Sequence, residues 1–299
     1  MAKKIFAFYS NYSDSRIDRF RQETKKKNIE FKSYNFNKDL MMTERGLIKI
    51  KNNQTINLDK DYFCWIFSNS MLSHYFEKLY AKNANFVWPS RAVADFSDKM
   101  YTNHFFKTIN VKTPKTILLS QNEETLLLKV NYVGGFPCII KKVFGTGGVE
   151  VGIVNSLDDL KFFVKNFYQK KFNKNFSPFL RASFALQEYI KNTNGNDYRV
   201  LCLDGKIIGG IKRSSQNGDF RANISLGGKA ENLPIDEKLK KICQKILRKR
   251  NFFYAGIDFI KKDTEYLAIE INTSAQFQGF EQATGINVAG KIIETMISK

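Results

Sequence analysis

The sequence is poor in the residues that build nucleophilic and soft-metal sites. Its only histidines, His74 and His104, have no partner pattern, so a Ser–His or Cys–His mechanism has little support. The four cysteines stand far apart among apolar residues, without CxxC or metal-ligand spacing, at Cys64, Cys138, Cys202 and Cys243. We therefore expect buried, reduced thiols, and neither a disulfide framework nor a zinc module.

The sequence also lacks a long apolar run. No stretch approaches the roughly 20 apolar residues that span a bilayer, and the first residues continue into strand-like sequence instead of a signal peptide. We expect a cytoplasmic protein with no membrane partner. The 299 residues, of which 43% are hydrophobic and 26% charged, suffice for two or three small lobes that share one site.

Acidic residues are scarce relative to basic ones. The chain has 48 Lys and Arg against 29 Asp and Glu, which gives a net charge of +19. This balance favours acidic partners such as nucleotides, nucleic acid or acidic peptides. A biased codon supply is a second explanation, because Lys, Asn, Ile and Phe are abundant together. There is no RGG tract, RNP motif or zinc module, so specific nucleic-acid recognition is not expected.

The most informative stretch is Ala255–Ser274, which is typical of two strands joined by a polar turn at 261–265. Asp258 lies in the first strand, and Glu270 and Asn272 lie two residues apart in the second, where they point to one face. Two carboxylates and an amide oxygen, with no His or Cys nearby, form a hard-oxygen set that suits Mg²⁺. The alternative is a hairpin whose acidic residues merely face water.

A second pattern joins a strand lysine to a run of glycines. The strand predicted at 136–141 ends on Lys141, and Gly145, Gly147 and Gly148 follow closely. An ammonium group and the backbone N–H groups of a mobile loop suit a polyphosphate. The glycine spacing matches neither a P-loop nor a Rossmann fingerprint, so an ordinary hairpin turn is the alternative.

The first part of the chain carries no catalytic signature. Strand-like runs at 4–9, 31–36, 54–58 and 62–67 alternate with helical sequence, which predicts a small α/β lobe with a parallel sheet. The loop Ser13–Arg16 follows the first strand, where α/β sheets often receive ligands. A helix cap explains that loop equally well.

The hairpin, together with the tail 279–293, resembles the ATP-grasp superfamily and most closely its RimK-like ATP-dependent carboxylate–amine ligases. The resemblance implies an α/β (α+β) chain with the ATP-grasp fold, in which two subdomains enclose ATP. The expected division is an N-terminal α/β lobe at 1–88, a central ATP-binding lobe at 89–190, and a C-terminal lobe at 191–299.

The same resemblance implies a metal site and a nucleotide site. Two Mg²⁺ ions, with Mn²⁺ as an alternative, are expected on Asp258, Glu270 and Asn272, where they bridge the ATP phosphates. The family pattern GDFR(S/A)N…GG is matched at 218–228, and 184–190 matches the segment that binds adenine. The expected nucleotide-binding residues are Lys99, Lys141, Gly145, Gly147, Gly148, Glu188, Tyr189, Asp197, Arg199, Arg221 and Asn223.

Two arginines, Arg221 and Arg213, match positions that stabilise the transferring phosphoryl group, which implies catalytic roles for them. Without the resemblance, the 218–228 segment is an ordinary polar loop, 184–190 is a core strand, and Lys99 is a solvated helix charge.

The resemblance therefore implies an enzyme that phosphorylates a carboxylate with ATP and passes the acyl group to an amine. The substrate is an acidic peptide or protein that gains an amino acid, a small amino acid, or a peptide that is macrocyclised. The alternative is a nucleotide-binding relative without ligase activity that acts as a sensor or scaffold. One departure bears on the substrates: many relatives have Ser-Pro-Gly after the asparagine, whereas this chain has Ser274-Ala275-Gln276, near the acceptor site. The two substrates and the oligomeric state, including a homo-oligomer, stay open.

Overall fold

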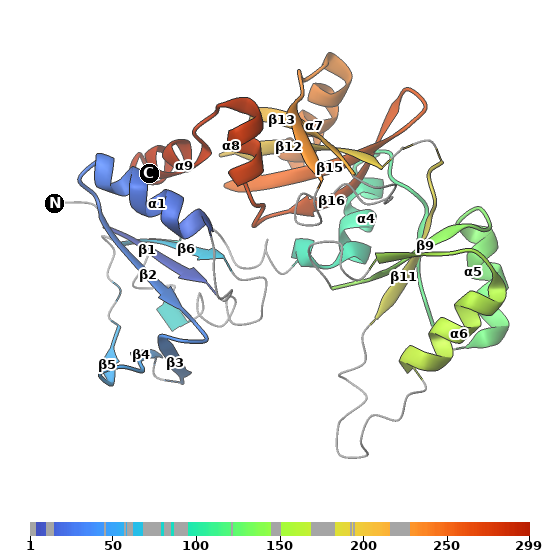
Figure 1. Ribbon diagram of the computed structural model, residues 1–299, viewed down its shortest axis with the longest axis horizontal. Coiled ribbons are helices and arrows are strands. Elements are labelled where there is room, and N and C mark those ends of the chain that lie inside the picture. Colours follow the sequence, from blue (N-terminus) through green and yellow to red (C-terminus); the bar gives the residue numbers. More distant parts are fainter. Residues whose placement is uncertain are drawn as a thin grey trace.

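The structure is a computed structural model with three groups of elements (Figure 1). It describes residues 4–9, 15–44, 46–56, 58, 62–67, 79–80, 85–86, 95–120, 122–144, 151–168, 183–191, 193, 195–215 and 228–299. No helix in this described part of the chain has both the length and the apolar character needed to cross a membrane.

The first group is an α/β lobe around four parallel strands in the order β2-β1-β6-β7. The central residues of β1 are all buried, as expected for a parallel strand covered on both faces. The lobe comprises β1 (Lys4–Tyr9), α1 (Ser15–Lys26), β2 (Glu30–Asn35), β3 (Leu40–Thr43), β4 (Gly46–Lys49), β5 (Gln54–Thr55), β6 (Tyr62–Phe67) and β7 (Asn85–Phe86). The predicted parallel sheet is confirmed.

The strand expected at 54–58 does not extend that sheet. Its first two residues form β5, the edge of a separate antiparallel sheet in the order β3-β4-β5. The turn before β4 ends on Gly46, whose φ of 132° is a conformation that L side chains rarely adopt. This turn folds β4 back on β3, and β5 then pairs with β4 instead of with the parallel strands.

The central group is a four-stranded antiparallel sheet in the order β10-β9-β11-β8, with two helices that pack against it. It comprises β8 (Thr116–Leu118), a 3₁₀ turn (Glu123–Thr125), α5 (Leu126–Tyr132), β9 (Cys138–Lys142), β10 (Val151–Val154), α6 (Leu157–Tyr168) and β11 (Phe184–Glu188). Leu126, Val130, Leu160 and Val164 lie at helical spacing on α5 and α6 and fill its core.

The third group is a five-stranded antiparallel sheet in the order β14-β13-β12-β15-β16. It comprises β12 (Asn196–Leu203), β13 (Lys206–Ser214), β14 (Lys229–Asn232), α7 (Glu237–Lys249), β15 (Tyr254–Lys262), β16 (Glu265–Asn272), α8 (Gln278–Thr284) and α9 (Val288–Ile297). The hairpin predicted with its turn at 261–265 forms, and Asp204-Gly205, a dipeptide typical of hairpin turns, joins β12 to β13. Asp204 and Asp263 both adopt positive φ in these turns.

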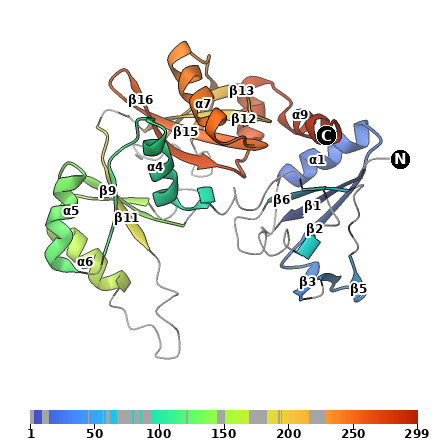
Figure 2. The ribbon, with the colours of Figure 1, turned by 180° about the vertical axis from the view of Figure 1, so that it is seen from behind.

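Helix α4 (Lys99–Thr108) packs against the third sheet, as Figure 2 shows. Asp98 caps the helix, because its Oδ1 accepts the backbone N–H groups of Met100 at 2.7 Å and Tyr101 at 3.1 Å. Phe106 is fully buried in one cluster with Ile257 and residues of α7. The lobe boundaries at 88 and 190 stay a prediction. Helix α4 falls in the stretch assigned to the central lobe, but it shares the hydrophobic core of the C-terminal lobe.

The first and third groups share another hydrophobic core. Ile5, Ala7, Ile17 and Phe20 of the first lobe are buried in one cluster with residues of β12, β13, α8 and α9. The ring of Phe20 meets that of Phe277 edge-on at 6.0 Å. The N-terminal and C-terminal lobes are therefore packed as one body, with α1 alongside α9 (Figure 1).

We predict that Phe20→Ala destabilises both lobes together. Phe20 is 1% exposed, so truncation leaves a cavity in the shared core and should lower the free energy of unfolding by about 3–5 kcal/mol. Phe162→Ala is the matched control, because Phe162 is 71% exposed and its loss should change stability by less than about 0.5 kcal/mol. Urea titration measures both variants, followed by Trp fluorescence, which reports the first lobe through Trp65 and Trp88, and by far-UV circular dichroism, which reports the whole chain. In Phe20→Ala, a fluorescence transition well before the circular dichroism transition would show that the core is not shared.

Candidate active site

One face of the C-terminal sheet carries apolar side chains at one end and charged side chains at the other. Alternation along β12 sends Val200 and Cys202 to the face that α4 and α7 cover, and Arg199 and Leu201 to the other. At one end of this second face, Leu201 and its neighbours pack against α8 and α9. At the other end the face carries Asp197, Arg199, Arg213, Asp258, Glu270 and Asn272.

The predicted metal ligands lie side by side on this charged end. Asp258 of β15 pairs directly with Glu270 of β16, and Gly256 pairs with Asn272. Gly256 and Asp258 are two residues apart on β15, as are Glu270 and Asn272 on β16, so all four positions lie on one face. Gly256 has no space for a side chain: a Cβ there would lie 2.8 Å from Ala275 Cβ and 3.3 Å from Arg199 Cδ. The turn after β16 therefore approaches closely, and Asp258, Glu270 and Asn272 are brought together as expected.

Asp258 is held by two arginines. Arg199 binds it through two parallel hydrogen bonds, Nε to Oδ1 at 2.7 Å and Nη2 to Oδ2 at 2.6 Å, and Arg213 Nη2 lies 3.1 Å from Oδ2. Arg213 also binds Asp197 in the same two-pronged way, at 2.5 and 2.8 Å. The expected anion-binding arginines thus use their guanidinium groups on carboxylates of the protein.

These contacts set the charge states of the two aspartates. Burial disfavours the charged form of Asp258, but the guanidinium groups of Arg199 and Arg213 outweigh it, so the pKa of Asp258 lies below its ordinary value. Burial dominates at Asp197, and the nearby Asp258 charge adds to it, so the pKa of Asp197 is raised despite the Arg213 partner. These contacts therefore favour the ionised form of Asp258.

The donor set fits a hard divalent cation. The described residues contain no group of three or more His, Cys, Asp or Glu that could hold a metal, but here the third ligand is an amide oxygen. Two hydrogen bonds from Arg199 and one ion pair with Arg213 occupy Asp258, which leaves one lone-pair position on its Oδ1. Within the described part of the chain, the Glu270 carboxylate makes no hydrogen bond or ion pair that competes with a cation. Two carboxylates and one amide oxygen are ligands that Mg²⁺ accepts.

Lys141 of the central lobe lies within electrostatic range of this set. It is buried at 7% exposure, and its Nζ donates to Gln187 Oε1 at 3.1 Å. Burial, and then the charge of Lys99, lower the pKa of Lys141 to about 8, while the charge of Glu270 opposes that shift. Lys141 is therefore within electrostatic range of both Lys99 and Glu270. That the two lysines bind phosphate stays a prediction.

The hydrogen-bond network that holds Lys141 was not identified from the sequence. Gln187 Nε2 donates to Thr116 Oγ1 at 2.8 Å, and Asn103 Nδ2 donates to the same oxygen at 3.2 Å. This buried network joins β9, β11 and β8 to α4, the helix that begins with Lys99. The available signal was one polar residue, Gln187, among the apolar residues of β11.

The end of β11 forms the link to the C-terminal lobe. Glu188 accepts the Lys115 backbone N–H at 3.2 Å and pairs with Lys262 Nζ at 2.8 Å. Burial disfavours the Glu188 carboxylate, but the hydrogen bonds from Lys262 and Lys115 prevail and lower its pKa. Tyr189 follows, half-buried, directly after the strand. The segment expected to bind adenine therefore lies where the central and C-terminal lobes meet.

Other predicted residues are not placed. Gly145, Gly147, Gly148, Arg221 and Asn223 lie outside the described residues. Their roles stay predictions.

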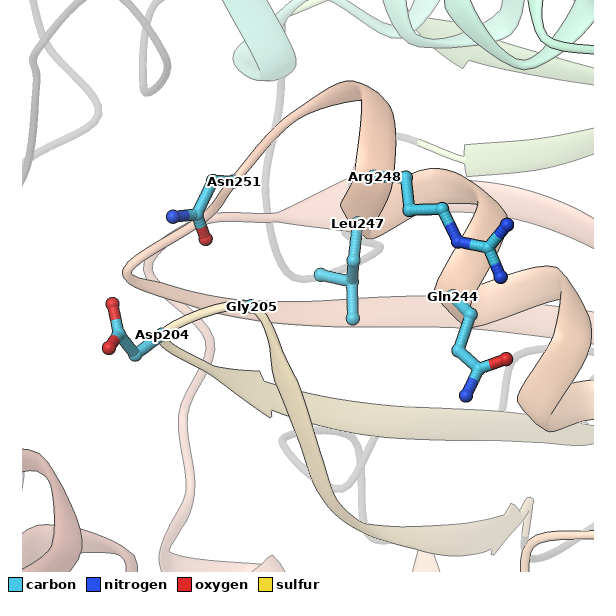
Figure 3. A pocket seen from close by; sticks show the side chains of 6 residues that line it. All are labelled: Asp204, Gly205, Gln244, Leu247, Arg248 and Asn251. Carbon is cyan, nitrogen blue, oxygen red and sulfur yellow. The ribbon is translucent and has the colours of Figure 1, made fainter.

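A shallow pocket of about 410 Å³ lies elsewhere (Figure 3). It is formed by the turn between β12 and β13 and the last turns of α7, and is lined by Asp204, Gly205, Gln244, Leu247, Arg248 and Asn251. Asp204 follows the end of β12 opposite to Asp197, so this pocket is separate from the carboxylate set.

Known proteins match both the sequence and the fold. A family model described as a RimK-like ATP-grasp domain matches residues 96–296. A probable alpha-L-glutamate ligase of Shewanella pealeana is 30% identical over 78% of this chain, which covers 48% of that protein. The coenzyme gamma-F420-2:alpha-L-glutamate ligase of Methanococcus maripaludis is 33% identical over 71% of this chain and 70% of its own length.

The fold is also found in a solved ATP-grasp ligase. PsnB, in complex with a phosphomimetic variant of its minimal precursor, Mg and ADP, superposes with a TM-score of 0.69 at 16% identity, over 98% of this chain and 97% of that one. This similarity confirms the predicted ATP-grasp fold.

The buried Lys141 predicts a rise in stability at alkaline pH. Its folded-state pKa is about 8 against 10.5 ordinarily, so the unfolded chain binds more protons between these values, and stability rises with pH. Between pH 7.5 and 9.5 the gain should be about 2 kcal/mol relative to Lys141→Met, which cannot titrate. Urea unfolding of both proteins at each pH measures it. The comparison with the variant removes the contributions of tyrosines and cysteines. If the difference in free energy of unfolding between the two proteins were the same at pH 7.5 and 9.5, Lys141 would not be desolvated.

Proposed function

Because the chain belongs to the RimK-like ATP-grasp family, we propose that it is an ATP-dependent ligase that joins a carboxylate to an amine. One observation carries the proposal: Asp258 pairs directly with Glu270 on the sheet face where Asn272 lies, and the charge of Glu270 acts on Lys141 of the other lobe. Carboxylates on one lobe and an ammonium on the other are what a metal-bound triphosphate needs.

The nucleotide would lie between the central and C-terminal lobes. Lys141 and Lys99 supply positive charge to the phosphates, and the predicted loop of Gly145, Gly147 and Gly148 covers them. The backbone at Glu188 and Tyr189 receives the base, as the resemblance implies. Closure of such a loop protects a reactive intermediate from water.

Asp258, Glu270 and Asn272 would hold Mg²⁺, for which Mn²⁺ can substitute, and two ions are expected. When bound, the metal neutralises charge on the phosphate oxygens. The two-pronged Arg199 contact keeps Asp258 ionised and fixes its orientation. Arg213 binds only carboxylates among its described contacts, so we assign it to holding Asp197 and Asp258. We assign to Arg221 the stabilisation of charge on the transferring phosphoryl group.

The reaction has two steps. An oxygen of the substrate carboxylate attacks the γ-phosphorus of ATP, the bond from that phosphorus to the bridging oxygen breaks, and ADP leaves. The amine nitrogen then attacks the acyl carbon, phosphate leaves with the electron pair of the C–O bond, and the nitrogen gives a proton to solvent. The products are an amide, ADP and phosphate.

For the substrates, we propose an amino acid as the amine and an acidic small molecule, peptide or protein as the carboxylate. Two relatives are named as ligases of L-glutamate, and the net charge of +19 suits acidic acceptors. The chain covers about half of the Shewanella relative, so its substrates do not transfer directly. A cytoplasmic site of action fits ATP as a substrate and the free thiols of Cys138, Cys202 and Cys243.

We predict that Glu270→Ala lowers substrate-dependent ADP release by about 10²-fold or more, because it removes one metal ligand at the phosphates. Glu265→Gln is the matched control: it changes an exposed carboxylate on the same strand whose ion pair with Lys112 is at the surface, so turnover should stay within about twofold. Turnover is followed as ADP over a panel of carboxylates with L-glutamate and other amino acids.

Hydroxylamine distinguishes the candidate functions. A ligase that forms an acyl phosphate will yield a hydroxamate when hydroxylamine replaces the amine, and mass spectrometry detects it. ATP binding without ADP release or hydroxamate on any carboxylate would favour a nucleotide-binding module instead. Full activity of Glu270→Ala would refute the assigned metal site.

A further inference from the structure

One face of α1 carries a row of polar side chains that bind the C-terminal lobe. Arg16, Arg19 and Glu23 lie on it at helical spacing, and Lys27 follows the helix end. Arg19 Nε pairs with Glu281 at 2.7 Å, Glu23 accepts from Asn287 at 3.0 Å, and Lys27 pairs with Glu294 at 2.7 Å. Their partners belong to α8, to α9 or to the N-terminal cap of α9. These contacts fasten two lobes together.

Arg16 differs from the rest of the row in its target and its burial. Its Nη1 donates to the backbone oxygen of Ser274 at 2.5 Å and to Ser274 Oγ at 3.1 Å. Ser274 lies in the turn that directly follows β16, and not on a docking helix. Arg16 is 3% exposed, whereas the side chains of Arg19 and Lys27 are 24% and 31% exposed. A buried guanidinium on a backbone oxygen makes a strong, charge-assisted contact.

The turn that Arg16 binds also contacts a metal ligand. The backbone N–H of Ser274 donates to Asn272 Oδ1 at 3.2 Å. This bond selects the orientation of the Asn272 amide and leaves the second lone pair of Oδ1 for a cation. The same peptide segment thus receives Arg16 on its carbonyl and presents its N–H to the ligand.

The turn is fixed on its other side as well. Tyr254 Oη donates to the Ala275 backbone oxygen at 3.1 Å, and Ala275 is fully buried against Gly256. Among the described residues, Arg16 makes the contact between the first lobe and this turn. Removing it would release the Ser274 carbonyl while the Tyr254 contact remains.

We propose that Arg16 is a positioning residue of the metal site, which acts through Ser274 on Asn272 and makes the first lobe part of the active site. The inference rests on the proposed function, because it assumes that Asn272 binds the divalent cation. The N-terminal lobe then has a role in metal binding, since α1 holds the turn that keeps the asparagine oxygen directed at the metal. Residues that orient a metal ligand commonly change metal affinity by about 10- to 100-fold when removed.

The test measures Mn²⁺ binding to the protein with ADP by electron paramagnetic resonance, which needs no turnover. Arg16→Met should weaken Mn²⁺ binding by about 10-fold or more. Arg19→Met is the matched control on the same helix face: it removes an ion pair between the lobes without touching the turn, and should leave Mn²⁺ affinity within about twofold. Arg16→Lys retains a charged donor and should restore part of the affinity.

Parallel measurements separate positioning from folding. ADP affinity without metal and urea midpoints are recorded for each variant. If Arg16→Met does not fold, Arg16→Lys and Arg19→Lys form the comparison, and the first should weaken Mn²⁺ binding more than the second. Equal Mn²⁺ affinity in the Arg16 and Arg19 variants overturns the inference and leaves Arg16 as an interface contact. Absence of Mn²⁺ binding in the unmodified protein would instead count against the proposed function.

Discussion

The two-pronged contact between Arg199 and Asp258 is the interaction on which the site depends. The two residues pair directly across β12 and β15, and both side chains are nearly excluded from solvent. Removing one partner of such a buried pair leaves an uncompensated charge, at a cost of about 3–5 kcal/mol. Arg213 and Asp197 extend the pair into an alternating row of charges. A carboxylate can stay ionised at this depth only because the row balances it, and an ionised carboxylate is what a divalent cation binds.

The three lobes contribute to this site in different ways. The C-terminal sheet carries the proposed oxygen ligands, and the central lobe, which has its own hydrophobic core, brings Lys141 within electrostatic range of Glu270. The first lobe shares a core with the C-terminal lobe and reaches the turn after β16 through Arg16. The contact between the central and C-terminal lobes, where Glu188 pairs with Lys262, would therefore set the distance between the Lys141 ammonium and the carboxylates.

Much of the fold was predictable, because each element carries a local signal. Strict alternation in 255–274 predicted the β15–β16 hairpin and placed Asp258, Glu270 and Asn272 on one face. The helical spacing of apolar residues in 157–172 is typical of the helix that α6 forms, and Asp204-Gly205 is typical of the turn between β12 and β13. The resemblance to ATP-grasp proteins added the relation between lobes, which no local pattern carries.

The rest depends on contacts between residues far apart in the chain. Arg16 and Ser274 are separated by 258 positions, and Lys141 and Gln187 by 46, so spacing gives no indication of either bond. The separate sheet of β3, β4 and β5 depends on a turn at Gly46, whereas the run at 54–58 was interpreted as part of the β/α alternation. The resemblance implied anion-binding roles for Arg199 and Arg213, and only the structure pairs Arg199 with Asp258 and Arg213 with Asp197.

The central claim is that oxygen atoms of Asp258, Glu270 and Asn272 hold divalent cations against a nucleotide. A crystal structure with Mn²⁺ and a nonhydrolysable ATP analogue, phased on the anomalous signal of manganese, tests it most directly. The account predicts manganese peaks about 2.1–2.3 Å from oxygens of these three side chains, bridged to the β- and γ-phosphates. Manganese bound elsewhere, or phosphates distant from β15 and β16, would contradict it.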